Sequence, residues 1–230
     1  MNDKTTMIEN NVSGIPEGIN TAAMRESYAT LFRLTLVVLI CTFIPNFGDS
    51  LLSRALIVLQ SVTPILAGFA IAFSVFLMGK QFPQYKTAGI FLLISRFSNY
   101  FINVMIPFLV SAVFPVEFTV NAMVLTLVSL GISILTSVLY YIGVYKLYRG
   151  HSEILGGLDL DLTHKWKILF VIELVLAVVY PVLNPVVTGM TASSSVLNSL
   201  TVWLMPILFN APVYGLNCLY LRRMMNHFES

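Results

Sequence analysis

The feature that most constrains this chain is a series of six long apolar runs separated by short polar segments. The runs cover residues 30–47, 55–78, 87–114, 118–145, 168–190 and 200–220. An α-helix needs about 20 apolar residues to cross ~30 Å of hydrocarbon. The runs are too long and continuous for the strands of a membrane barrel, and a backbone in lipid must satisfy its own hydrogen bonds. The sequence therefore predicts an all-α, polytopic membrane helix bundle of about six transmembrane helices.

The composition agrees with a membrane protein. Charged residues make up 10% of the chain and hydrophobic residues 57%, whereas a soluble domain carries about 25% charged residues to keep its surface wet. Cys41 and Cys218 both fall inside apolar runs, so we expect two small buried side chains without a disulfide. The basic residues are dispersed, and we expect no nucleic-acid partner.

Basic residues alternate from one connection to the next. Segments 115–117 and 191–199 carry no Lys or Arg, and the first connection carries only Arg54. The intervening segments and both ends are basic, with Lys4, Arg25, Arg33, Lys80, Lys86, Lys146, Arg149, Lys165, Lys167, Arg222 and Arg223. Cytoplasmic loops carry an excess of Lys and Arg, so this alternation predicts six spans with both termini in the cytoplasm.

The same alternation sets the expected domain organisation. We expect a polar cytoplasmic tail over residues 1–28, a six-helix transmembrane domain over 29–221 and a short cytoplasmic tail over 222–230. The compact loops and short tails make a bacterial inner membrane the default location, with the protein spanning it several times.

Two charges lie well inside apolar runs. Arg96 lies ~15 Å beyond Lys86, and Glu173 lies ~9 Å beyond Lys167, at a helical rise of ~1.5 Å per residue. A charge within a span costs at least ~2.5–3.5 kcal/mol, so it normally faces protein or water and has a partner. The long arginine side chain can bridge the difference in depth, and the two residues are therefore able to pair.

Three asparagines extend this predicted polar cluster. Asn99 and Asn103 share a helix face with Arg96, and Asn210 lies at a similar depth in the last run. One interpretation is a substrate-binding or ion-coupling site in which Arg96 holds an anionic group and Glu173 accepts a proton or cation. The other is a structural salt bridge that fixes helix register, and the sequence leaves both open.

The last two runs contain residues that interrupt helices. Each proline removes a backbone donor and clashes with the preceding turn. Unwound segments of this kind form substrate sites in many carriers, although proline is also tolerated in membrane helices where it only sets curvature. The candidate helix breaks are Pro181, Asn184, Pro185, Pro206 and Pro212.

Small residues recur at helical spacing in two runs. Gly68 and Ala72 lie four residues apart, as do Ser129, Ser133 and Ser137. Close packing of helix backbones in lipid is the simpler interpretation. A substrate groove lined by the serines is the alternative.

Enzyme signatures are weak. The His151–His164 region also holds Glu153, Asp159 and Asp161, but a turn followed by a helix capped by Asp161 or Thr163 explains it more simply than a metal site. No metalloprotease helix, nucleophile elbow or phosphate-binding loop is present in the sequence. We therefore expect no enzyme, no metal and no cofactor.

The leading functional hypothesis is a small solute or ion transporter, or the membrane subunit of one, in which case a separate ATPase is a candidate partner. The alternative is a non-transporting accessory or scaffold protein that stabilises a membrane partner. In that case the basic segment 146–167 is the docking surface.

Overall fold

The computed structural model describes residues 19–45, 51–102, 122–156, 158–191 and 194–229. These residues form six long helices and no strand, as the sequence predicts. The helices are α1 (Thr21–Thr42), α2 (Leu51–Met78), α3 (Pro83–Tyr100), α5 (Ala122–Leu155), α6 (Leu160–Thr191) and α7 (Ser195–Asn226).

Four stretches are long and apolar enough to cross a membrane, which is the property expected of a membrane protein. They are Arg54–Met78, Leu130–Leu155, Leu160–Thr191 and Val196–Asn226. Within the described residues, α1 and α3 do not reach the same threshold. The predicted third run continues to residue 114, and its last part lies outside the described residues.

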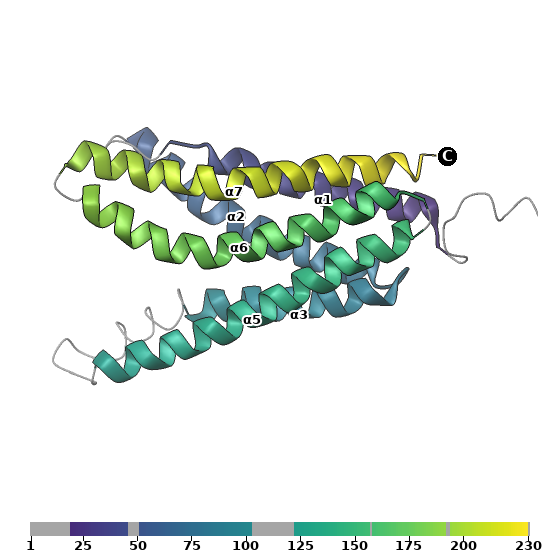
Figure 1. The fold of residues 1–230 in the computed structure, drawn as a ribbon, viewed down its shortest axis with the longest axis horizontal. Helices are drawn as coiled ribbons and strands as arrows, with labels where there is room; N and C mark the ends of the chain where they lie inside the picture. Colours follow the sequence, from purple (N-terminus) through teal and green to yellow (C-terminus); the bar gives the residue numbers. More distant parts are fainter. Residues whose placement is uncertain (1–18, 46–50, 103–121, 157, 192–193, 230) are drawn as a thin grey trace, which may run out of the picture.

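The six helices form a closed ring in chain order. Each helix packs against its neighbours in the sequence, and α7 returns to pack against α1. In Figure 1, α5 meets α6 at the end of the bundle that carries the C-terminus and runs away from it toward the opposite end. We call the end that carries the C-terminus the closed end, and we call the opposite end the far end.

The closed end holds most of the buried core. The closed end consists of the start of α1, the α2–α3 connection, the α5–α6 connection and the end of α7. Tyr28, Tyr85, His151 and Trp166 are almost fully buried there. The Tyr85 hydroxyl lies 2.7 Å from the Tyr28 hydroxyl and 2.8 Å from Nδ1 of His151. Four helices are thus joined at one aromatic cluster.

Both terminal boundaries differ from the expected tails. The helix α1 begins at Thr21, and the Asn20 side chain caps it by accepting a hydrogen bond from the Ala23 N–H at 3.0 Å. Such caps satisfy a donor that the first helical turn leaves free. At the other end α7 continues to Asn226, and Phe228 is buried beyond it. Residues expected in the tails therefore belong to the core.

The α5–α6 connection is shorter than expected. Helix α5 continues to Leu155 and α6 begins at Leu160, so most of segment 146–167 is helical. The Oδ1 atom of Asp159 accepts a hydrogen bond from the Leu162 N–H at 2.9 Å. The cap is thus Asp159 rather than Asp161 or Thr163, because α6 starts before either of those residues.

The prolines do not break their helices. Helix α6 is continuous through Pro181 and Pro185, and α7 is continuous through Pro206 and Pro212. In Figure 1, α6 follows a shallow curve without an unwound segment. The expected unwound backbone is therefore absent from these two described helices, where neighbouring helical hydrogen bonds maintain the helix around each missing N–H.

Two glycines allow close packing of α2, α3 and α5. A Cβ atom on Gly89 would meet the backbone of Phe76, and one on Gly143 would lie 2.9 Å from Cγ of Leu92. Helices approach this closely in lipid only where a side chain is missing. Cys41 and Cys218 are buried free thiols, as the sequence predicts.

Candidate functional site

A small cavity whose mainly apolar wall includes several polar and charged groups lies at the centre of the ring, with a volume of about 90 Å³. A volume of this size has room for a few water molecules or a small ion. All six helices contribute to its wall, which contains Leu31, Thr35, Gly68, Ile71, Ala72, Leu92, Arg96, Tyr140, Val144, Leu147, Tyr148, His151, Glu173, Val213, Tyr214, Asn217 and Leu221. The cavity therefore joins both of the charges that the sequence singles out within apolar runs.

The Arg96 side chain stacks on an aromatic ring. Its guanidinium carbon lies 4.9 Å from the centre of the Tyr140 ring. Such an arrangement is worth about 2 kcal/mol or more where water is excluded. Gly68 makes room for this side chain, because a Cβ atom at that position would lie 3.2 Å from Nε of Arg96.

Glu173 is held by two tyrosine hydroxyls. Tyr140 donates to Oε1 at 3.0 Å and Tyr148 donates to Oε2 at 2.9 Å. The Tyr148 hydroxyl in turn accepts a hydrogen bond from Nδ2 of Asn217 at 3.2 Å. Hydrogen bonds to a charged acceptor are the strong ones, so this network compensates part of the cost of burying the carboxylate.

Tyr140 connects the two charges. Its ring lies under Arg96 and its hydroxyl donates to Glu173. Among the described residues no carboxylate comes within 4 Å of the Arg96 guanidinium, so the direct pair that the sequence allows is not formed, and Tyr140 contacts both residues instead. The guanidinium carries five N–H donors, and none of them reaches a carboxylate among the described residues.

A second, polar hollow adjoins the cavity between α3, α5 and α7. It has a volume of about 290 Å³ and is lined by Ser95, Arg96, Asn99, Ser133, Thr136, Ser137, Tyr140, Tyr141 and Tyr214. We call it the side hollow. Arg96, Tyr140 and Tyr214 belong to both walls, so they separate the side hollow from the cavity.

The structure brings together only part of the predicted cluster. Arg96 and Glu173 line the cavity, and Asn99 lines the side hollow. Asn103 lies outside the described residues. Asn210 is exposed on α7 and lines neither space. Asn210 lies ~10 Å along the helix from Asn217, toward the far end. The depth of a residue in an apolar run does not say which helical turn reaches the cavity, so the sequence could not distinguish the two asparagines.

The predicted helix breaks stand apart from both spaces. Pro181, Asn184 and Pro185 on α6, and Pro206 and Pro212 on α7, are not part of either wall. Two of the predicted small residues of α5, Ser133 and Ser137, do line the side hollow. The side chain of Ser129 lies outside the described residues.

Several site residues carry no obvious signal as single residues. Glu173 accepts hydrogen bonds from Tyr140 and Tyr148, and Asn217 donates one to Tyr148. Tyrosines at the end of a span are, however, also typical interface anchors. The spacing of Tyr140, Val144, Leu147 and His151 places them on one face of α5. The polar groups at both ends of this face are the sequence pattern that could have identified these site residues.

The three acidic residues near the α5–α6 connection, Glu153, Asp159 and Asp161, are each paired with a basic side chain. Asp159 contacts Arg223 at 2.8 Å and His227 at 3.0 Å. Burial raises the pKa of Asp159, but the hydrogen bonds from the Leu162 N–H and His227, together with the charge of Arg223, hold it below its ordinary value. Within the described part of the chain, no three His, Cys, Asp or Glu residues gather as a metal site would require.

The comparisons with known proteins leave the cavity as the basis for a function. No protein-family model, curated protein or solved structure matches this chain.

Proposed function

We propose that this protein is a membrane transporter for a small anion, coupled to a proton, or the membrane subunit of such a transporter. The observation that carries the proposal is the central cavity, in which Arg96 and Glu173 share the bridging residue Tyr140. Intramembrane charges that face a cavity mark ion and substrate pathways in other membrane proteins.

The two charges have complementary roles in this proposal. Arg96 offers guanidinium N–H donors to an anion, since no carboxylate among the described residues pairs with them. Glu173 takes up the proton that accompanies the anion, and its tyrosine donors then release or rotate. The small volume of the cavity favours a small ion over a large solute.

The side hollow supplies the route to the cavity. It meets the cavity at Arg96, Tyr140 and Tyr214, and it lies on the far-end side of the aromatic cluster. Movement of the Tyr140 and Tyr214 rings would join the two spaces. The aromatic cluster at the closed end blocks the other side in this conformation.

The proposed orientation has six spans with both termini in the cytoplasm of a cell whose surface membrane the protein crosses. It is supported by the distribution of basic residues over the bundle. Arg25, Lys80, Lys165 and Arg223 all belong to the closed end, while Arg54 is near the start of α2 at the other end. The closed end then faces the cytoplasm.

The experiment is a proton-flux assay on purified protein in liposomes that contain a pH-sensitive dye. Inorganic phosphate, lactate and glutamate serve as probe anions on the outside. We expect at least one probe to drive proton entry, and we expect Arg96→Met and Glu173→Gln to abolish it. Both variants must keep the melting temperature of the parent protein to within a few degrees for this result to support a site.

Two results contradict the proposal. Parent liposomes that behave as empty liposomes with every probe would remove the transport function. A loss of folded protein in both variants, with no flux in the parent, would favour the structural bridge and the accessory hypothesis. Native mass spectrometry of the tagged protein would then look for a stoichiometric partner on the basic segment 146–167.

A further inference from the structure

A long groove follows the contact between α5 and α6. Two hollows compose it, of about 500 Å³ near the closed end and about 590 Å³ toward the far end. Tyr145 and Phe170 line both hollows. The two spaces therefore meet at this pair and form one groove with two parts.

The part near the closed end is the more polar of the two and carries the charged side chains of the groove, and we call it the polar part. Its wall contains Tyr145, Tyr148, Arg149, Ser152, Glu153, Thr163, Lys167, Phe170 and Val171. Arg149 pairs with Glu153 at 2.6 Å. Lys167 is exposed and has no carboxylate within 4 Å among the described residues. Two cations against one carboxylate leave this part with one net positive charge.

Two hydroxyl groups in this wall have no hydrogen-bond partner. The Oγ atom of Ser152 and the Oγ1 atom of Thr163 are buried and unpaired. Buried polar atoms are nearly always paired in folded proteins, and an unpaired one calls for a missing partner. A polar group bound in this part of the groove would supply one after a small side-chain rotation.

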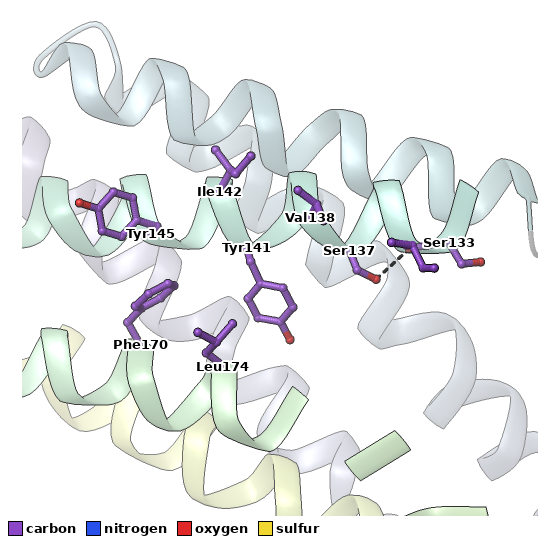
Figure 2. Close-up of a pocket in the computed structure, with 9 residues that line it drawn as sticks. Ser133, Ser137, Val138, Tyr141, Ile142, Tyr145, Phe170 and Leu174 are labelled. Carbon is purple, nitrogen blue, oxygen red and sulfur yellow. Dashed lines mark hydrogen bonds between the residues drawn. The ribbon is translucent and has the colours of Figure 1, made fainter. Parts of the chain in front are cut away.

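The part toward the far end is mainly apolar. Figure 2 shows Tyr141, Phe170 and Leu174 directed into the space between the two helices, with Val138 and Ile142 along α5. From Ser133 to Tyr145 this part is ~18 Å long at a helical rise of ~1.5 Å per residue. One leaflet of the hydrocarbon core is ~15 Å thick, so the apolar part matches the length of one acyl chain.

The order of the two parts along the groove also matches a lipid. From Tyr145 to Ser152 the polar part covers ~10 Å, and headgroup regions add several ångströms to each side of the hydrocarbon core. Tyr145 lies at the boundary between them, where tyrosine is enriched at membrane interfaces.

We propose that the α5–α6 groove binds a phospholipid with a singly negative headgroup. The phosphate lies near Arg149, Lys167 and the two unpaired hydroxyls, and one acyl chain follows Ile142, Val138 and Leu174. A free phosphate ion would not need the apolar part. The groove shares the wall residue Tyr148 with the central cavity, but the variants that test the groove change neither Arg96 nor Glu173, so the two proposals can fail separately.

The test is native mass spectrometry of the full chain in mild detergent with added phosphatidylglycerol or phosphatidylcholine of the same acyl composition. We expect the parent protein to retain phosphatidylglycerol preferentially. In Arg149→Gln/Lys167→Gln this lipid should bind at least about tenfold more weakly, as expected for lost hydrogen bonds to a charged group. Binding of phosphatidylcholine should change little.

Matched variants separate the two parts of the groove. Ile142→Trp fills the apolar part and should weaken both lipids, whereas Leu135→Trp, also exposed on α5 but outside the groove, should weaken neither. Ser152→Ala should weaken phosphatidylglycerol binding without lowering the melting temperature of lipid-free protein, because it removes an unpaired hydroxyl. Lys165→Gln, whose lysine pairs with Asp161 outside the groove, serves as the charge control.

Four results would overturn the proposal. The first is equal binding of the two lipids by the parent protein. The second is an equal loss in Lys165→Gln and in the double variant, and the third is no effect of Ile142→Trp. Displacement of the bound lipid by excess inorganic phosphate would assign the polar part to a free ion instead.

Discussion

The six helices pack tightly at the closed end of the bundle and more loosely at the far end. At the closed end Tyr28, Tyr85 and Trp166 have no measurable exposure. Near the far end large apolar side chains such as Val178, Val182 and Met190 are 63–78% exposed. A Cβ atom on Gly89 meets the Phe76 backbone, whereas one on Gly131 or Gly189 meets nothing within 4 Å.

This difference separates stability from access. The closed end joins the helices through aromatic packing, hydrogen bonds and ion pairs, so it fixes where Arg96, Tyr140 and Glu173 lie. The far end leaves α5 and α6 apart and keeps the side hollow next to these residues. We infer that substitutions at the closed end change stability, whereas equivalent substitutions toward the far end leave the fold nearly unchanged.

The largest expected effect is that of Trp166→Ala. This change removes a fully buried indole from the centre of the aromatic cluster, and such truncations cost about 3–5 kcal/mol. Thermal unfolding in detergent should show a fall of about 6 °C or more, at roughly 2–4 °C per kcal/mol. Trp203→Ala is the matched change toward the far end, and an equal or larger fall there would contradict the comparison.

The next effect is that of Gly89→Val. The added side chain must push against the α2 backbone, and overpacking costs about 1–3 kcal/mol or more. Size-exclusion chromatography of detergent extracts should show less monodisperse protein. Gly131→Val faces open space and should leave the profile unchanged, so a similar loss in both variants would remove the proposed contrast.

A smaller effect is expected for Tyr85→Phe. The lost hydroxyl removes the shorter hydrogen bonds of Tyr28 and His151 and leaves only their mutual contact at 3.4 Å, at a cost of about 1–3 kcal/mol. Tyr180→Phe in α6 provides the comparison, because Tyr180 contacts Phe209 through its ring. Melting temperatures of the two variants should differ by a few degrees, with Tyr85→Phe the lower.

The smallest expected effect is that of Asp159→Asn on the melting temperature at acid pH. The pKa of Asp159 is held below its ordinary value in the folded protein, so its charged form stabilises the fold above about pH 4. This stabilisation is lost as pH falls below that value. Asp159→Asn keeps a good capping residue but removes the ion pair with Arg223, so its melting temperature should fall less than that of the parent between pH 5 and pH 3. Identical falls would contradict this role.

The fold class was predictable because apolar runs of this length have one physical solution in lipid. The start of α1 was also predictable in principle. Met24, Tyr28, Leu31, Thr35 and Val38 are all buried, and their spacing of four and three residues is the repeat of a helix that packs along one stripe. The start of this helix is hard to recognise in the sequence because polar residues such as Arg25, Glu26 and Ser27 lie between Met24 and Tyr28.

The site was only partly predictable, because sequence gives depth but not direction. Arg96 and Glu173 stand out as charges inside apolar runs, and both line the cavity. Asn210 and Asn217 both lie on the last helix, and only Asn217 reaches the cavity network. Which tyrosine would bridge the charges depends on how α3, α5 and α6 rotate about their axes, and no single residue reveals that.

The most direct test of the central claim is cysteine accessibility around Arg96. Cys41→Ala/Cys218→Ala provides a thiol-free background, into which Asn99→Cys is introduced, because Asn99 lines the side hollow and not the α5–α6 groove. A membrane-impermeant thiol reagent should label it in intact cells, and an added anion that binds at Arg96 should slow labelling. The same reagent applied to the cytoplasmic face of inverted vesicles should label it poorly. Labelling from the cytoplasmic face alone, or from neither face, would contradict a polar site that opens away from the closed end.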